Sequence, residues 1–183
     1  PFANIAHGCN SDIATKLSLH LADWAITEAG FAFDLGAEKF FDIKCRVAGL
    51  DPAVVVLVAT VRALQYHGGV ALGDLSPPVV AAVERGLPNL EKHIESIHHF
   101  GKAPVIALNR FDTDAPDEID AIARCCERLG AAFAVSDHFA RGGAGAEDLA
   151  RTVMSRADEG RDAFVPLYPL EAPLPDTVPA VAQ

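Results

Sequence analysis

Short, uninterrupted apolar runs separated by segments of helical periodicity constrain the fold of this chain more than any other feature. The runs are rich in Val, Ile and Ala, are bounded by Gly, Pro, Asp or Asn, and lie at residues 25–27, 54–61, 105–108 and 131–135. Because polar residues do not alternate with the apolar ones, each run is typical of a strand covered on both faces, as in a parallel sheet.

Helical patterns lie between these runs and after the last one, at residues 10–21, 39–47, 89–100, 117–129 and 146–157. In one of them Ile94, Ile97 and Phe100 recur on a single helix face. Repeated alternation of strand and helix requires right-handed crossovers between parallel strands. The order therefore predicts an α/β fold with a doubly wound, mostly parallel sheet.

Composition excludes several classes of protein. The chain has 183 residues, of which 50% are hydrophobic, so it can bury a core and is not a disordered segment. Its longest apolar run falls short of the roughly 18 to 20 residues that cross a bilayer, and residues 1–20 lack the pattern of a secretion signal. A net charge of -10 argues against binding to nucleic acid. We expect a soluble, cytoplasmic protein that binds neither nucleic acid nor membrane.

Prolines mark the end of the chain as a separate segment. They stand at positions 166, 169, 173, 175 and 179, where neither a helix nor a central strand is predicted. We expect residues 1–165 to form the α/β part and residues 166–183 a Pro-rich extension. Both ends begin and stop in the middle of a pattern, so we also expect the chain to be a piece of a longer protein.

Ligands of an open parallel sheet bind beyond the carboxyl ends of the strands. The first such segment contains Glu28, Gly30 and Lys39, which offer an acid, a close backbone approach and a cation. A capped loop that leads into a helix explains the same residues. The second segment places Arg62 and His67 after a strand, although surface ion pairing of Arg62 is an equal alternative.

The third segment, Asn109 to Asp114, follows another predicted strand. Phe111 after Asn109 and Arg110 is a candidate platform for stacking a flat ligand. The same residues match the Asn-[Lys/Arg]-x-Asp pattern of guanine-recognising proteins, so a GTPase-like nucleotide-binding domain is an alternative. Helix capping by Asp112 and Asp114 is a further explanation of these two residues.

The fourth segment combines Phe139 and Arg141 with Gly142 and Gly143 in a glycine-rich stretch that leads into a helix. Backbone N–H groups of such a stretch attract anions, but a flexible turn explains it as well. No G-x-x-x-x-G-K-[ST] phosphate loop occurs in the chain, and no ligand spacing predicts a metal site.

Several of these segments together resemble the formate-tetrahydrofolate ligase (formyltetrahydrofolate synthetase) family. The similar stretches are PFANIAHGCNSDIATK at 1–16, TEAGFAFDLGAEKFFDIK at 27–44, VATVRALQYHGG at 58–69, NLEKHI at 89–94, NRFDTD at 109–114 and LYPL at 167–170. They occur in the family's order and run nearly end to end, and they correspond to the middle of a longer family member.

The resemblance implies a P-loop NTPase-like architecture whose phosphate-loop segment is missing here. It also implies ATP-dependent joining of formate to tetrahydrofolate, which gives 10-formyltetrahydrofolate, ADP and phosphate through formyl phosphate. ATP with Mg²⁺ would be required, a monovalent cation is a further candidate, and the full-length enzyme would be a homo-oligomer. We expect the fragment alone to be inactive. A non-catalytic folate-binding module is the alternative from another functional class.

The resemblance also assigns roles to residues. Asn109, Phe111 and Phe139 would bind tetrahydrofolate, with its pterin between the two rings. Glu28, Phe31 and Arg62 are assigned to catalysis. The residues assigned to the vicinity of formyl phosphate are Gly30, Lys39, Arg110, Gly142 and Gly143.

Four residues depart from the family pattern. Ala32, Phe33, Gln65 and Phe139 stand where the family has Gly, Ala, Lys and Trp, respectively.

Overall fold

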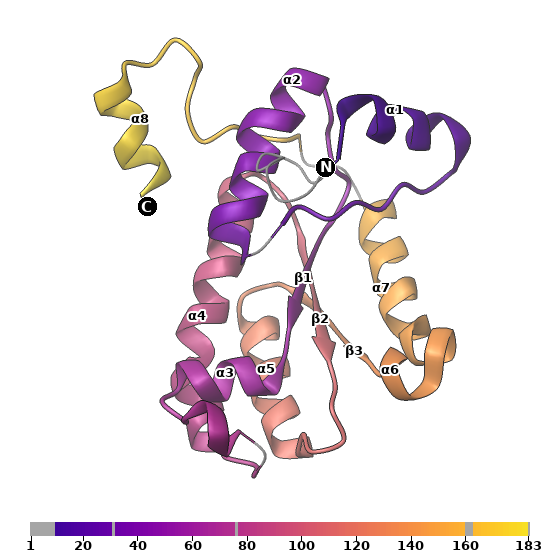
Figure 1. The fold of residues 1–183 in the computed structure, drawn as a ribbon, viewed down its shortest axis with the longest axis vertical. Helices are drawn as coiled ribbons and strands as arrows, with labels where there is room; N and C mark the ends of the chain where they lie inside the picture. Colours follow the sequence, from indigo (N-terminus) through magenta and orange to yellow (C-terminus); the bar gives the residue numbers. More distant parts are fainter. Residues whose placement is uncertain (1–9, 31, 76, 160–162, 183) are drawn as a thin grey trace. The chain divides into compact units, whose positions relative to one another are not determined.

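The computed structural model describes residues 10–30, 32–75, 77–159 and 163–182 (Figure 1). The chain forms two compact units. The helical unit comprises Pro1–Pro52, His99–Gly101 and Ala163–Gln183, and the sheet unit comprises Ala53–His98 and Lys102–Asp162. We describe each unit by itself.

The sheet unit is built on three parallel strands in the order β1-β2-β3, namely β1 (Val55–Ala59), β2 (Pro104–Asn109) and β3 (Ala132–Ser136). Ile106 of the central strand pairs with Leu57 on one side and Phe133 on the other. Every residue of β2 except its last is buried, as an uninterrupted apolar run predicts. The predicted α/β fold and the last three predicted strands are confirmed.

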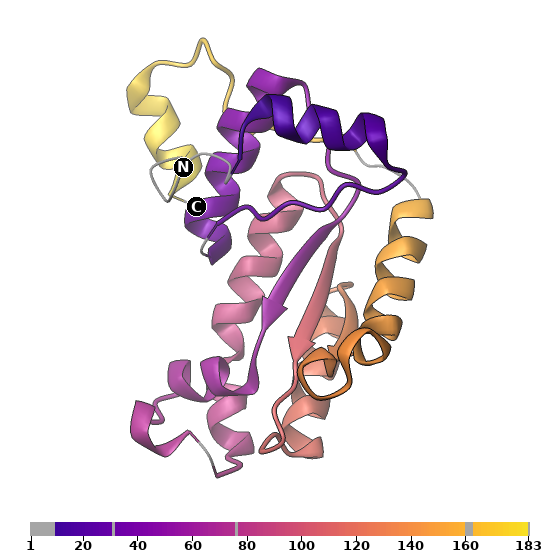
Figure 2. The same cartoon turned by 45° about the vertical axis from the view of Figure 1, so that its right-hand side comes forward.

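Helices cover both faces of this sheet. They are α3 (Val61–His67), α4 (Val80–His99), α5 (Pro116–Arg128), the short α6 (His138–Arg141) and α7 (Glu147–Asp158). Ile106 and Leu108 of β2 pack with Val83 and Ile94 of α4 and Ile122 of α5 in one core. Figures 1 and 2 show α7 on the other face, against β3.

The structure corrects the predicted start of α4. The helix begins at Val80 instead of residue 89 and continues through Pro88. Pro88 and Glu84 are both exposed, so water can solvate the Glu84 carbonyl that loses its helical hydrogen bond. Ala82 and Val83 are completely buried on the other side of the same turns. Burial of this side offsets the roughly 3 kcal/mol by which proline disfavours a helix interior.

Two glycines allow α3 and α4 to approach each other closely. A Cβ atom on Gly86 would lie 2.0 Å from the carbonyl oxygen of Leu64, and one on Gly68 would lie 1.8 Å from that of Ala82. Both contacts are with backbone, which cannot rotate away. The helix α3, which carries Arg62, therefore packs against α4 with the two backbones in contact at Gly68 and Gly86.

The helical unit begins with α1 (Asp12–Leu21), where the hydroxyl of Ser11 accepts a hydrogen bond from the Ala14 amide at 3.1 Å. Residues 22–30 follow as neither helix nor strand, so the predicted strand at 25–27 is wrong. Ile26 is 95% exposed. In the described residues of this unit the run meets no neighbouring strand, and an isolated strand cannot satisfy its backbone groups.

A continuous helical run covers residues 32–48. It consists of the wide π-helical turns Ala32–Ala37 and Phe40–Cys45 and ends in α2 (Arg46–Ala48). The run starts before the predicted residue 39 because Phe33 is anchored in a core. Its ring centroid lies 6.1 Å from that of Phe41 and 5.8 Å from that of Phe100.

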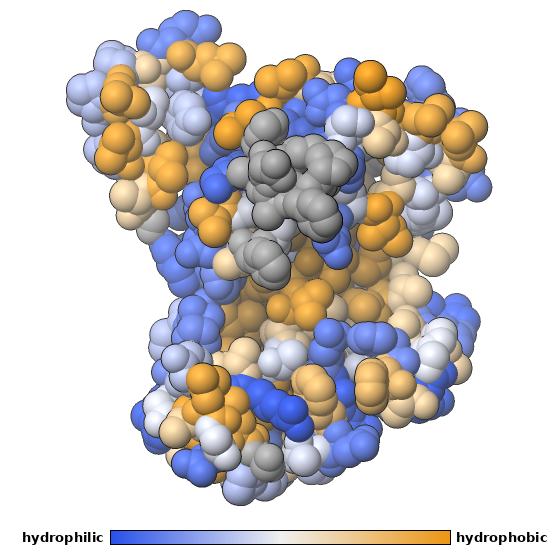
Figure 3. Space-filling model, in the orientation of Figure 1, coloured by the Kyte–Doolittle hydropathy of each residue, from blue (hydrophilic) through white to orange (hydrophobic). Residues whose placement is uncertain are grey.

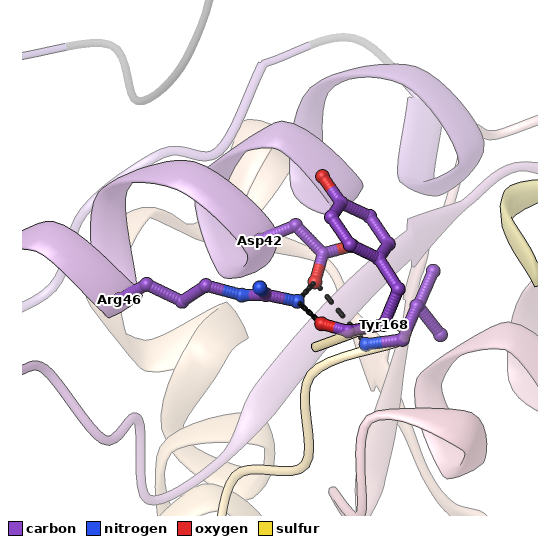
Figure 4. Close-up of polar contacts among 4 residues, drawn as sticks. Asp42, Arg46 and Tyr168 are labelled. Carbon is purple, nitrogen blue, oxygen red and sulfur yellow. Dashed lines mark hydrogen bonds and ion pairs between the residues drawn. The ribbon is translucent and has the colours of Figure 1, made fainter. Parts of the chain in front are cut away.

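Charged residues of this run hold the residues that follow 163 (Figure 4). Arg46 donates to the carboxylate of Asp42 at 2.8 Å and also to the carbonyl of Tyr168. Its guanidinium lies 4.5 Å from the centre of the Tyr168 ring. Asp42 accepts a second bond, from the amide of Leu167 at 3.2 Å. The LYPL motif is thus bound to the helix by one buried ion pair.

The Pro-rich segment contains a helix that we did not predict, α8 (Leu174–Val181). Pro175 lies in its first turn, where no helical N–H bond is required, and Pro179 lies inside it. The expectation that no helix forms after residue 166 is wrong. The proposed boundary between residues 165 and 166 stays a prediction.

Both terminal helices carry exposed apolar side chains. On α1 they include Ile13, Leu17 and Leu21, which recur every four residues, and on α8 they include Leu174 and Val178. Figure 3 shows hydrophobic residues on the surface of these helices. No helix in the described part of the chain is long and apolar enough to span a membrane.

The close crossing of α3 and α4 predicts the effect of Gly86→Ala. Alanine is favoured over glycine in a free helix by about 1 kcal/mol. Here its Cβ would meet the Leu64 carbonyl, so we expect the free energy of unfolding to fall by about 1–3 kcal/mol in urea denaturation. Gly73→Ala is the control, because no atom lies within 4 Å of its Cβ position. Equal stability of the two variants would contradict the close crossing.

Candidate functional site

The carboxyl ends of the three strands lie at one edge of the sheet because the strands are parallel. β1 is followed by Thr60, whose hydroxyl accepts from the Ala63 amide at 3.1 Å and caps α3. Arg110, which follows β2, donates its amide to the carbonyl of Ser136 at the end of β3 at 3.0 Å. The predicted site residues at or after the ends of the three strands are Arg62, Asn109, Arg110, Phe111, Phe139, Gly142 and Gly143.

Arg62 lies against the ring of Phe111. Its guanidinium carbon is 4.3 Å from the ring centre, and Nη2 donates to the Thr113 hydroxyl at 3.3 Å. A cation in this position is attracted to the aromatic face. Phe111 remains 38% exposed, so a flat ligand that stacks on it would use the face away from Arg62. In this geometry Arg62 supports the ring.

A tight turn fixes the backbone of Phe111. Its amide donates to Oδ2 of Asp114 at 2.8 Å, and the Asp114 amide donates to the Phe111 carbonyl at 3.0 Å. Burial of Asp114 raises the pKa of its carboxyl above the ordinary value of 3.8, although the Phe111 amide opposes this shift. The charge of Glu118 raises the pKa further, and the charges of Arg62 and Arg110 lower it.

The segment after β3 presents an aromatic ring beside a closed glycine turn. Phe139 is 92% exposed, and the neighbouring His138 has Nδ1 at 2.9 Å from the Ser136 hydroxyl. The amide of Asp137 donates to the Gly145 carbonyl at 2.8 Å, which folds residues 142–146 back onto the strand end. The first turn of α7 carries Glu147 and Asp148, so an anion held there would depend on nearby cations.

The remaining predicted site residues belong to the helical unit. Glu28 is exposed, Gly30 has a φ of 100°, and Lys39 lies within the helical run. Phe31 lies outside the described residues. A Cβ on Gly36 would lie 2.6 Å from the Ala29 carbonyl, so the run packs directly on the turn that contains Glu28 and Gly30.

Two polar groupings were missed by the sequence analysis. One is the Asp42–Arg46 pair, for which the four-residue spacing of opposite charges was an available signal. The other joins Gln65 to the completely buried Glu118 by a hydrogen bond of 2.7 Å. Glu118 stands three residues after the helix cap Ala115, a position typical of a capping glutamate, but only the fold shows that it is buried.

The three cysteines in the described part of the chain are all buried. Burial raises the pKa of Cys125, and it raises that of Cys126 to about 12. Cys45, Cys125 and Cys126 form no disulfide. Cys9 lies outside the described residues. Within the described residues no three His, Cys, Asp or Glu side chains gather so as to hold a metal ion.

Comparison with known proteins decides the family. The sequence profile of the family described as formate-tetrahydrofolate ligase matches residues 1–183. The chain belongs to the formate-tetrahydrofolate ligase family. It is 56% identical to a formate-tetrahydrofolate ligase of Zymomonas mobilis over 184 residues, 52% identical to one of Granulibacter bethesdensis and 51% identical to one of Hyphomonas neptunium.

These matches cover all of this chain but only 32–33% of each ligase. The chain therefore spans about a third of the length of the ligases it resembles. The resemblance inferred from the motifs is confirmed at the level of the family.

The turn beside Glu28 predicts a stabilising substitution, Ala32→Gly. Ala32 has a φ of 53°, which is unfavourable for any residue with a Cβ. We expect Ala32→Gly to raise the free energy of unfolding by about 1 kcal/mol in urea denaturation. Ala37→Gly in the same run is the control and should lower it by about 1 kcal/mol. A loss of stability in both variants would refute the strained turn.

Asp114 predicts a pH-dependent stability difference. Because its pKa is raised on folding, its contribution to stability is present at low pH and is lost as the pH rises through the folded pKa. Asn at this position keeps an oxygen for the Phe111 amide. We expect Asp114→Asn to be more stable than the unsubstituted chain at pH 7, and the advantage to vanish below the ordinary pKa of 3.8. Denaturation across this range would measure it, and a constant difference would refute it.

Proposed function

We propose that this chain forms the tetrahydrofolate clamp and part of the formyl phosphate site of a formate-tetrahydrofolate ligase. The observation that carries the proposal is the exposed, Arg62-backed ring of Phe111 at the strand edge that also bears Phe139. Membership of the family supplies the reaction. The products would be 10-formyltetrahydrofolate, ADP and phosphate.

The clamp would consist of two aromatic residues at the ends of neighbouring strands. Phe111 offers one face to a pterin, and Phe139 offers a second ring from α6. Asn109, the last residue of β2, lies at the same edge and would bind a polar group of the ligand. Holding the pterin in this way raises the effective concentration of the reacting amine, which can contribute about 7–11 kcal/mol at best.

The family resemblance assigns the vicinity of formyl phosphate to Glu28, Gly30, Phe31 and Lys39, which belong to the helical unit, and separately to Arg110, which belongs to the sheet unit. Gly142 and Gly143 would contribute backbone N–H groups. A formate oxygen attacks the γ-phosphorus of ATP and ADP leaves, which forms formyl phosphate. The tetrahydrofolate amine then attacks the formyl carbon, phosphate leaves, and the amine loses its proton. Both steps depend on positioning and charge neutralisation.

The nucleotide would be held outside the described residues. ATP carries Mg²⁺ with it, but the described residues include no acidic cluster that fits the ion, so we assign none of them to it. We extend the proposal to a P-loop NTPase-like architecture, a monovalent cation, assembly as a homo-oligomer and a cytoplasmic location. Each of these rests on the family resemblance alone.

The clamp is tested by Phe111→Ala. Stacking of a base on an aromatic ring is worth about 1–3 kcal/mol in comparable sites. We expect the affinity of the chain for tetrahydrofolate, measured by isothermal titration calorimetry, to fall by that amount. Tyr66→Ala is the matched control, since Tyr66 is a half-exposed aromatic residue that contacts His67 and not Arg62. Unchanged affinity in Phe111→Ala would refute the clamp.

Turnover separates the proposal from its alternatives. We expect the 183-residue chain alone to form no ADP in the presence of formate, ATP and tetrahydrofolate. Robust formation of ADP would overturn the inactivity of the isolated chain. A non-catalytic folate-binding module would bind tetrahydrofolate yet stay inactive within a full-length protein. Binding of GTP that is abolished by Asn109→Ala would favour the GTPase-like alternative.

A further inference from the structure

Glu118 occupies an ordinary helix position in an unusual environment. It is the third residue of α5, and its Oε2 accepts from the amide of Ala115, the residue that caps the helix, at 3.1 Å. A glutamate in this role is normally at the surface. Glu118 is 0% exposed, so burial of its carboxylate needs further hydrogen bonds to offset the loss of water.

Those hydrogen bonds come from two other segments. Oε1 of Glu118 accepts from the side-chain amide of Gln65 at 2.7 Å and from the backbone amide of Val79 at 2.8 Å. The same Gln65 nitrogen also donates to the Pro77 carbonyl at 3.2 Å. One carboxylate therefore joins α3, the segment before α4, and the start of α5.

Both residues of this junction are close in sequence to residues of the candidate folate site. Gln65 lies three residues after Arg62, about one turn of α3, and Glu118 lies four residues after Asp114, which precedes α5. Arg62 contacts Phe111 and Asp114 holds its amide. Displacing α3 relative to α5 would therefore separate the guanidinium from the ring that it supports.

We propose that Gln65 and Glu118 are positioning residues of the tetrahydrofolate site, which hold Arg62 and the Phe111 turn in register. The inference rests on the proposed stacking of tetrahydrofolate on Phe111. Neither residue needs to touch the ligand. Their hydrogen bonds set the distance between two helix ends, and the stacking surface is formed where these ends meet.

Leucine and lysine at position 65 would differ in whether they keep the hydrogen bonds that Gln65 donates. Its nitrogen donates twice, whereas its Oε1 is buried and accepts no hydrogen bond from the described residues. Leucine at this position would remove the donor and leave the Glu118 carboxylate short of a partner. Lysine would keep a donor for both Glu118 and Pro77 and would remove the unsatisfied oxygen. The two variants separate the hydrogen bond from the bulk of the side chain.

The test compares Gln65→Leu and Gln65→Lys in the full 183-residue chain. Hydrogen–deuterium exchange of residues 109–118 reports the position of the turn without a ligand, and calorimetric titration reports the affinity for tetrahydrofolate. We expect Gln65→Leu to speed exchange there and to weaken binding roughly tenfold. Gln65→Lys should restore both. Glu91→Gln is the matched control, because this carboxylate pairs with Arg128 at the opposite end of α5.

Equal losses in Gln65→Leu and Gln65→Lys would overturn the inference, since bulk and not the hydrogen bond would then matter. Unchanged affinity in Gln65→Leu, in a chain that binds tetrahydrofolate through Phe111, would overturn it as well and would leave the proposed function intact. Failure of the unsubstituted chain to bind tetrahydrofolate would overturn the proposed function and this inference with it.

Discussion

The parallel ladder of β1, β2 and β3 is the constraint on which the arrangement of the sheet unit depends. Pairing of Ala59 with Leu108, and of Asn109 with Ser136, brings all three strand ends to a common level. The side chains that follow each strand must then meet at that edge. A sheet with an antiparallel strand would send one of these segments to the opposite end. The contact between Arg62 and Phe111 therefore requires parallel strands first, and complementary side chains second.

The helical unit is organised by aromatic packing. The rings of Phe41 and Phe100 stack with centroids 4.8 Å apart, and Phe33 and Phe164 complete the cluster. Phe33 stands where the family pattern has a small residue, and its burial accounts for the larger side chain. The same helical run also packs on the turn that contains Glu28 and Gly30, where Gly36 lies against the Ala29 carbonyl.

The sequence predicted strands correctly where an apolar run also has a neighbouring strand in the tertiary structure. The runs that became β2 and β3 are apolar, bounded by turn residues and long enough to pair. The run at 25–27 has the same composition, but composition does not supply a neighbouring strand. The prolines after residue 166 misled for the opposite reason, because their local penalty was taken as decisive, yet Pro175 lies in the first turn of α8 and Pro179 lies inside this helix. In α4, burial of the other side of the helix offsets the penalty of Pro88.

The sequence by itself determined the three runs that form the sheet, the family, and which polar residues follow each strand, because all of these are written in local patterns and motifs. Only the tertiary structure decided that Arg62 backs the ring of Phe111, that Asp42 and Arg46 hold the LYPL segment, and that Glu118 is buried and bonded to Gln65. Each of these joins residues far apart in the chain. Such contacts depend on how the helices pack against the sheet. Periodicity along the chain does not show which residues of different elements come into contact.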